Sequence, residues 1–201
     1  MNKVLTKQIC LTSGLPTPQW AVINKNELEE NRGETVSLEK IKTLPRKLII
    51  KPVSQGSSAG MSIINHRAEL YPALKAAFRY GQQAMVEQYI AGREFTVGIL
   101  GGRPLPVIEI KPKCKFYDYR AKYVKGQSEH IVPAQITTQL TRLLQDYAVR
   151  IFTALGCRAV ARVDFMVDKN NVIWVLEINT IPGMTEVSLL PESARAADIN
   201  F

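Results

Sequence analysis

The amino-acid sequence predicts a mixed α/β or α+β fold, on three observations. Short apolar runs with strand character alternate with longer segments whose apolar residues recur at helical spacing. Hydrophobic residues make up 46% of the chain and charged residues 22%, which is ordinary for a globular protein and excludes a disordered or fibrous one. The length of 201 residues suits one large domain or two small ones that share a cleft.

The first half of the chain is expected to form short strands with helices between them. Asn2 can cap a first helix, which Gly14 closes. A later strand must end where Lys51 is followed by Pro52, because a residue before proline is restricted to extended backbone. In order, the expected elements are a helix over 2–12, a strand over 20–23, a polar surface helix or loop over 27–45, strands over 47–51 and 61–64, a helix over 67–79 and a strand over 84–89.

The second half is expected to hold two hairpins separated by a long helix. The first hairpin would turn at Gly101-Gly102. The helix is the clearest element, because apolar residues recur at helical spacing until Gly156 ends the pattern. In order, the expected elements are a hinge at 90–92, strands over 94–100 and 105–110, a helix over 136–155 and strands over 159–167 and 172–179.

The last hairpin, within 159–180, could carry a metal site. If its turn is the two residues Lys169-Asn170, then Glu177 faces Arg162 and Val175 faces Asp164. Side chains alternate along strands, so the polar residues would share one face: Arg162, Asp164, Glu177 and Asn179. Carboxylate and amide oxygens are ligands that Mg²⁺ takes beside phosphate. The alternative is a solvated polar face, and a three-residue turn would send Glu177 to the opposite side.

Three other segments could contact a ligand. The loop 53–60 contains Gly-Ser-Ser-Ala-Gly, whose backbone N–H groups and hydroxyls can cradle phosphate, or which is simply a flexible hairpin loop. Segment 111–130 shows no period and mixes six basic residues with aromatics, as in a lid over a polyphosphate, a single-stranded nucleic-acid surface or a solvated face. In 182–188, Gly183 could offer an N–H to an oxyanion and Ser188 a hydroxyl to a carboxylate.

Charge and cysteine content restrict the class of protein. The formal net charge is +8, which leaves nucleic acid, phosphate-bearing ligands and acidic surfaces open as partners. No apolar run approaches the roughly 18 residues of a membrane span, and the N-terminus lacks the apolar core of a signal peptide. The three cysteines are widely spaced, without a CxxC pair, which argues against a disulfide framework or zinc site. We expect a cytoplasmic protein with no membrane partner.

Taken together, the motifs resemble a known family. They occur in this order: Lys51-Pro and Gly-Ser-Ser-x-Gly, Val86-Glu87 and Gly92-x-Glu94-Phe-Thr-Val, Tyr117-Asp-Tyr-x-Ala-Lys-Tyr123, Arg162-x-Asp164, and Glu177-x-Asn179-Thr-x-Pro-Gly-Met-Thr185. This series resembles the D-alanine–D-alanine ligases of the ATP-grasp superfamily, from residue 2 to residue 201. Relative to that family, the sequence lacks the leading domain and the closing C-terminal helix.

The resemblance implies an ATP-grasp fold, in which two lobes grip ATP between antiparallel sheets. The first lobe would cover 1–87 and the second 88–201, with the hinge at 87–92 and a lid formed by 111–130. The resemblance also implies which residues contact the nucleotide. These are Lys3, Lys51 and Lys122 at the phosphates, Glu87, Gln88 and Ile90 at the adenine, and Glu94 at the ribose.

The resemblance further implies the catalytic groups. Asp164, Glu177 and Asn179 would bind two Mg²⁺ (or Mn²⁺) ions, while Arg162 and the Gly183 N–H would stabilise the tetrahedral intermediate. The remaining implied residues are Ser188 and Leu189, which would position the second D-alanine, and Ser57 and Tyr123, which would join across the site when the lid closes.

The implied reaction joins two D-alanines through a D-alanyl phosphate, with ATP and D-alanine as partners, for peptidoglycan synthesis. Nucleic acid is not an expected partner, and the full-length family implies a homodimer. Three positions depart from the family's usual residues, namely Gln55 and Arg120, where acidic residues are frequent, and Asn2, where Asp is common. Three alternatives remain: a folded, nucleotide-binding but inactive fragment; a related D-alanine–D-lactate ligase, which usually carries histidine where Tyr123 stands; and a basic nucleic-acid module.

Overall fold

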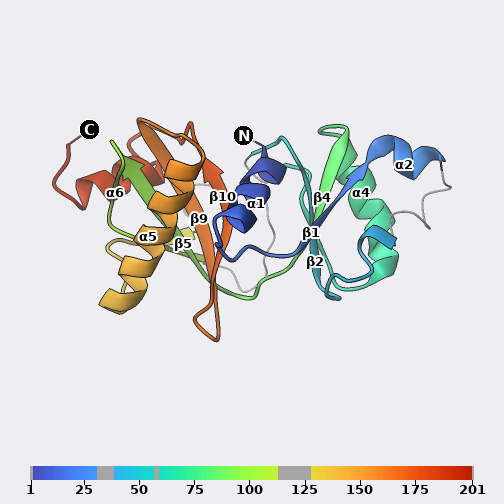
Figure 1. The fold of residues 1–201 in the computed structure, drawn as a ribbon, viewed down its shortest axis with the longest axis horizontal. Coiled ribbons are helices and arrows are strands. Elements are labelled where there is room, and N and C mark those ends of the chain that lie inside the picture. The colour runs from blue at the N-terminus through green and yellow to red at the C-terminus, as the bar shows by residue number, and fades with distance from the viewer. Residues whose placement is uncertain (1, 31–38, 57–58, 113–127, 201) are drawn as a thin grey trace. The chain divides into compact units, whose positions relative to one another are not determined.

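A computed structural model describes residues 2–30, 39–56, 59–112 and 128–200. The chain divides into two compact units, each built on an antiparallel sheet (Figure 1). Unit 1 contains Met1–Val4 and Pro18–Ile90, and unit 2 contains Leu5–Thr17 and Ala91–Phe201. Among the described helices, none has the length and apolarity needed to cross a membrane.

Unit 1 is a sheet with one apolar face and an opposite face that mixes charged residues with apolar ones such as Ile49 and Met85. Its strand order is β1-β4-β2-β3, with β1 at Trp20–Asn24, β2 at Leu48–Pro52, β3 at Ser62–Ile64 and β4 at Gln83–Gln88. Alternate residues of the strands, such as Ile23, Ile50 and Val86, are fully buried in one cluster with the apolar side of α4, Leu70–Phe78. The remaining helices of this unit are α2 at Lys25–Glu30 and a 3₁₀ turn, η1, at Arg67–Glu69.

Unit 2 is a larger antiparallel sheet with the order β10-β9-β5-β7-β8, and β6 pairs with β5. Its strands are β5 at Gly92–Leu100, β6 at Arg103–Pro104, β7 at Ile108–Pro112, β8 at Ser128–Ile131, β9 at Val160–Asp168 and β10 at Ile173–Asn179. One face is apolar and includes Phe95, Val163, Phe165 and Val175, all fully buried.

Two helices contribute to the apolar core of unit 2. Helix α5, Thr138–Ala154, is capped by the Thr137 hydroxyl, which accepts a hydrogen bond from the Leu140 N–H, and it buries Leu144, Ala148 and Ile151. Helix α1, Lys3–Thr12, is capped by the Asn2 side chain, which accepts from the Val4 N–H, and it contributes Cys10 to the same core. Gly14, at φ +63°, closes it in the left-handed conformation expected after a helix.

Most of the expected elements are confirmed, including the Asn2 cap, the turn at Gly101-Gly102 and the long helix. Two expectations were wrong. Segment 111–130 is not a loop at its two ends, because residues 111–112 extend β7 and 128–130 belong to β8, and these strands pair. A last helix, α6 at Leu189–Arg195, was not expected; residues 113–127 lie outside the described part.

The division into compact units differs from the lobes expected from the sequence. The unit boundary falls after Ile90, and Leu5–Thr17 groups with unit 2 instead of the N-terminal unit. The physical reason is apolar packing, since Cys10 and Leu15 are buried in the core of unit 2. The expected lobes, 1–87 and 88–201, and the hinge at 87–92 stay predictions.

Candidate active site

The last hairpin carries four predicted site residues, but through a different register from the expected one. Glu177 lies opposite Asp164, not opposite Arg162, and Asn179 lies opposite Arg162. Val175 lies opposite a core residue of β9, not opposite Asp164. Directly opposed residues share a face, so Arg162, Asp164, Glu177 and Asn179 lie on one face of the sheet, as the sequence predicted.

Two features produce this register. The turn spans Lys169 to Asn171 and is one residue longer than expected; it is closed by a hydrogen bond from the Asp168 N–H to the Val172 carbonyl, 3.1 Å. Asn171 takes the left-handed conformation, φ 60°, that such a turn needs. A β-bulge then lies between Val175 and Glu177. Each feature shifts the pairing of β10 with β9 by one residue. Together they shift it by two residues, which returns the same side chains to the same face.

Asp164 is the centre of hydrogen bonding on this face. Its side chain accepts from Arg162 Nε and Nη2, both at 2.9 Å, so the guanidinium is bound in a fork. Thr96 Oγ1, on β5, donates to Asp164 Oδ1 at 2.6 Å, and Asn179 Nδ2 donates to Oδ2 at 3.2 Å. Asp164 is 8% exposed, so these contacts offset the cost of burying its charge.

The chemistry of these side chains fits a divalent cation. Asp164 and Glu177 supply carboxylate oxygens, and Asn179 supplies an amide oxygen while its nitrogen is directed to Asp164. Glu177 is half-buried, and no hydrogen bond joins its carboxylate to any other residue that the structure describes. Within the described residues no cluster of three or more His, Cys, Asp or Glu occurs. A metal site here would therefore need the Asn179 amide oxygen in addition to the two carboxylates. A cation would compete with Arg162 for the Asp164 oxygens.

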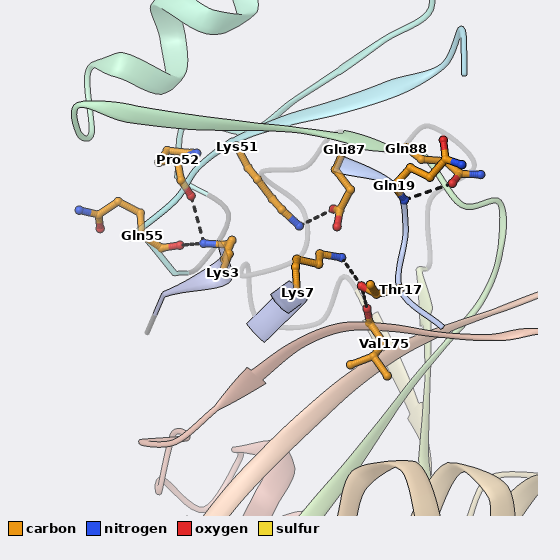
Figure 2. A network of polar contacts seen from close by, with 10 residues as sticks. All are labelled: Lys3, Lys7, Thr17, Gln19, Lys51, Pro52, Gln55, Glu87, Gln88 and Val175. Atoms are coloured by element: carbon orange, nitrogen blue, oxygen red, sulfur yellow. Dashed lines mark hydrogen bonds and ion pairs between the residues drawn. The ribbon is translucent and has the colours of Figure 1, made fainter. Parts of the chain in front are cut away.

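In unit 1, the mixed face of the sheet holds a buried ion pair. Lys51 on β2 and Glu87 on β4 lie on the face opposite the apolar core, and Lys51 Nζ is 2.5 Å from Glu87 Oε2 (Figure 2). The two side chains are only 11% and 1% exposed. The pair therefore holds the Lys51 ammonium in a fixed place next to the Glu87 carboxylate.

Lys3 contacts the same loop. Its ammonium donates to the Pro52 carbonyl at 3.2 Å and to the Gln55 carbonyl, both acceptors being labelled in Figure 2. Gly60, at the other end of the loop, has φ +69°, and a Cβ there would lie 2.5 Å from the Tyr80 ring. Glycine is thus required at this end by conformation and by the ring.

The residues expected around adenine and ribose are distributed over both units. Gln88 ends β4, and its side-chain oxygen accepts from the Gln19 N–H at 3.3 Å. Ile90 is buried at 7% exposure and belongs to unit 1. Glu94 belongs to unit 2 and is 8% exposed; by its pairing in β5 it shares a sheet face with Thr96 and Asp164.

The segment before α6 brings together Gly183 and Ser188. Ser188 precedes α6 at its N-cap, and its hydroxyl accepts from the Thr185 N–H at 3.1 Å. A Cβ on Gly183 would lie 2.8 Å from Ser188 Oγ, so only glycine allows this approach. Leu189 is the first residue of α6. The expected oxyanion and carboxylate donors therefore lie next to each other.

Three expected site residues, Ser57, Lys122 and Tyr123, lie outside the described part of the structure. The sequence reasoning also missed Thr96, which bonds Asp164 directly. The signal was available, because Glu94 was an expected site residue and Thr96 follows it at strand alternation, on the same face. It missed the bulge too, although the spacing of Ile173, Val175 and Ile178 breaks strand alternation.

The chain is similar in sequence and in fold to known ligases. A curated D-alanine–D-alanine ligase of Syntrophotalea carbinolica is 46% identical over 100% of this chain, which spans 62% of that relative's length. A crystal structure of D-alanine–D-alanine ligase from Bacillus anthracis matches 99% of this chain and 62% of its own, with 35% identity and a TM-score of 0.85. A structure of the Bacillus anthracis ligase complexed with ATP matches the same shares, with 34% identity and a TM-score of 0.81.

The described sheets are antiparallel, as in the ATP-grasp fold of these ligases. The family described as the D-ala D-ala ligase C-terminus matches residues 9–201, which include strands β9 and β10 and the Gly183–Ser188 segment. With the motif order, the sheet architecture and this match in agreement, the chain belongs to the D-Ala–D-Ala ligase C-terminal family.

Proposed function

We propose that this chain carries the ATP-dependent part of a D-alanine–D-alanine ligase, whose dipeptide product serves peptidoglycan synthesis. The observation that carries the proposal is the acidic face of unit 2. Arg162, Asp164, Glu177 and Asn179 share one face, and the family match covers them all. The chain spans less than two thirds of the relatives that it matches, so activity and substrates are inferred from this site.

In the proposed reaction, the carboxylate of the first D-alanine attacks the γ-phosphorus of ATP, giving D-alanyl phosphate and ADP. The amine of the second D-alanine then attacks the acyl carbon, loses its proton, and inorganic phosphate leaves. Asp164, Glu177 and Asn179 would hold Mg²⁺ or Mn²⁺, which when bound neutralises charge on the phosphates. Arg162, oriented by its fork to Asp164, would stabilise negative charge on the transferring group and the tetrahedral intermediate.

Other residues would bind and orient the substrates. Gly183 would offer its N–H to the oxyanion, and Ser188 with Leu189 would position the second D-alanine. Lys3 and Lys51 would contact the nucleotide phosphates. The remaining nucleotide contacts would come from Glu87, Gln88, Ile90 and Glu94, with Ser57, Lys122 and Tyr123 completing the site.

The test is phosphate release from ATP and Mg²⁺ with and without D-alanine, with the product identified by mass spectrometry. We expect phosphate release that depends on D-alanine, and a loss of about 100-fold or more in Glu177→Gln. Glu39→Gln, which removes an exposed carboxylate from unit 1, is the matched control and should leave the rate unchanged.

The same assay decides between the alternatives. ATP binding without turnover would support an inactive, nucleotide-binding fragment. A depsipeptide formed in the presence of D-lactate would indicate the related D-alanine–D-lactate ligases. No nucleotide binding at millimolar ATP with Mg²⁺ would overturn the proposal, and tighter, salt-dependent binding of single-stranded oligonucleotide would favour the nucleic-acid alternative.

A further inference from the structure

The outer edge of β10 is held at one residue by the segment that follows α1. β10 is the first strand in the order of the unit 2 sheet, so its outer edge has no strand beside it among the described residues. At that edge, the Val175 N–H donates to the Pro16 carbonyl at 2.9 Å. The Val175 carbonyl accepts from Thr17 Oγ1 at 2.8 Å (Figure 2). Both backbone groups of Val175 are therefore bound.

A buried lysine fixes the direction of the Thr17 hydrogen bond. Lys7 Nζ lies 2.7 Å from Thr17 Oγ1, and Lys7 is completely buried on α1 (Figure 2). An ammonium can only donate, so the Thr17 oxygen accepts from Lys7 and its single proton is directed to Val175. Hydrogen bonds from a charged donor are also stronger than neutral ones. Lys7, Thr17 and Val175 therefore form an ordered chain of donors that ends at β10.

Val175 is the residue immediately before the bulge. It pairs with Phe165, whereas Glu177 pairs with Asp164, so Leu176 is the extra residue. A regular ladder would instead place Leu176 opposite Asp164 and turn Glu177 toward the apolar core. Two constraints confine the extra residue to its position. Val175 is bound at the sheet edge by Pro16 and Thr17, and Ile178 is buried in the apolar core at 2% exposure. Glu177 therefore stays on the acidic face.

We propose that Thr17, oriented by Lys7, is a positioning residue for the metal-binding face, because it holds Val175 and so fixes the bulge that places Glu177 beside Asp164. The inference rests on the proposed function in taking Glu177 as a metal ligand. In this proposal Thr17 and Lys7 are not themselves metal ligands. They act through the backbone of β10.

The first experiment compares Thr17→Val, which keeps the shape but removes the hydroxyl, with Thr17→Ser, which restores it. Mn²⁺ binding is measured by electron paramagnetic resonance, and amide hydrogen exchange is followed in 175–179. We expect about a tenfold loss of Mn²⁺ affinity in Thr17→Val, faster exchange in 175–179, and near-complete recovery in Thr17→Ser. Thr12→Val, at an exposed position of α1, is the control and should change neither.

A double variant separates positioning from simple stabilisation. Deleting Leu176 removes the extra residue, so a regular ladder then keeps Glu177 opposite Asp164 whether or not Val175 is held. In that background Thr17→Val should no longer weaken Mn²⁺ binding, although it should still lower the thermal midpoint. If Thr17→Val does not fold, Lys7→Met gives the same comparison, with an effect of the same sign.

Each outcome bears on the proposal. Unchanged Mn²⁺ affinity and unchanged exchange in 175–179 in a folded Thr17→Val would overturn it, as would an equal loss of affinity in the variant that lacks Leu176. If the wild-type protein binds no Mn²⁺, the proposed function fails, and the exchange of 175–179 still decides whether Thr17 positions the bulge.

Discussion

The two sheets of this protein bring charged side chains to one face in different ways. In unit 1 the strands are in regular register, and Lys51 and Glu87 reach the same face by simple alternation. In unit 2 the acidic face of β9 and β10 exists only because a longer turn and a bulge compensate for each other. The regular sheet buries a formed ion pair, whereas the bulged sheet leaves the Glu177 carboxylate without a hydrogen bond among the described residues.

The two sheets are therefore expected to tolerate insertions and deletions differently. A regular strand buried on both faces allows no shift, because every side chain beyond the shift changes faces. A bulged strand contains one extra residue that has no pairing partner on the neighbouring strand, so its removal leaves the pairing of the others intact. The oxygens that we propose as metal ligands lie in the sheet with the irregular strand, and bulges are common beside active sites.

The largest expected effect comes from deleting one residue in each sheet. Deleting Val86 from β4 should turn Glu87 into the apolar core and lower the free energy of unfolding by about 3–5 kcal/mol, because it buries a charge away from Lys51. Deleting Leu176 from β10 should cost less than about 2 kcal/mol, since the ladder becomes regular and the faces are kept. Urea denaturation followed by circular dichroism measures both.

A deletion in the turn provides a control for shortening the chain. Removing Lys169 leaves Asn170-Asn171, residue types that tolerate the left-handed conformation of a two-residue turn. The strand pairing is unchanged, so the loss should be small. Equal destabilisation by the deletions of Val86 and Leu176 would contradict the difference drawn between the two sheets.

A smaller effect is expected from the buried pair of unit 1. Lys51→Met should lower the free energy of unfolding by about 3 kcal/mol, because Glu87 is 1% exposed and would lose a charged partner. The double variant Lys51→Met/Glu87→Leu should recover most of this loss, since replacing both charges with apolar groups leaves none unpaired. Thermal and urea unfolding of the four proteins in the cycle give the coupling energy.

ATP binding by the same variants tests whether the pair has a second role. If Lys51 contacts phosphate, the double variant should be stable and yet bind ATP more weakly than wild type. If the double variant is as unstable as Lys51→Met, the unpaired charge of Glu87 contributes little to the lost free energy of unfolding.

The smallest effect concerns an ion pair on the core side of unit 2. Arg93 donates two hydrogen bonds to Glu109, at 2.7 and 2.8 Å, and these hold the pKa of Glu109 below its ordinary value of 4.5. A lowered pKa in the folded state stabilises the protein above pH 4.5, and this stabilisation is lost as the pH falls from there through the folded pKa. Because Arg93 is 48% exposed, screening keeps the contribution small.

We therefore expect the free energy of unfolding to fall with pH below about 4.5, and to fall less steeply in Glu109→Gln. Urea midpoints measured from about pH 6 to about pH 3 test this. Glu129→Gln, at an exposed position on β8, is the control and should keep the wild-type slope. Identical slopes in the wild type and Glu109→Gln would show that this pair does not contribute to the pH dependence.

Much of the fold followed from local rules. Asn2 and Gly14 delimit the first helix because capping and left-handed closure depend on a few neighbouring residues. The long helix followed from its apolar spacing. The packing of α1 with unit 2 could not be predicted in this way, because it depends on where Cys10 and Leu15 find an apolar core.

The fold class, the family and the four residues of the acidic face could all be predicted from the sequence alone. The predicted pairing was nevertheless wrong by two residues, from Glu177 opposite Arg162 to Glu177 opposite Asp164. The face survived because side chains in a strand repeat every two residues, so an even shift keeps them on the same side. Only the tertiary structure decided that shift, through the conformation of Asn171 in the turn and the burial of Val175 and Ile178 on either side of one extra residue.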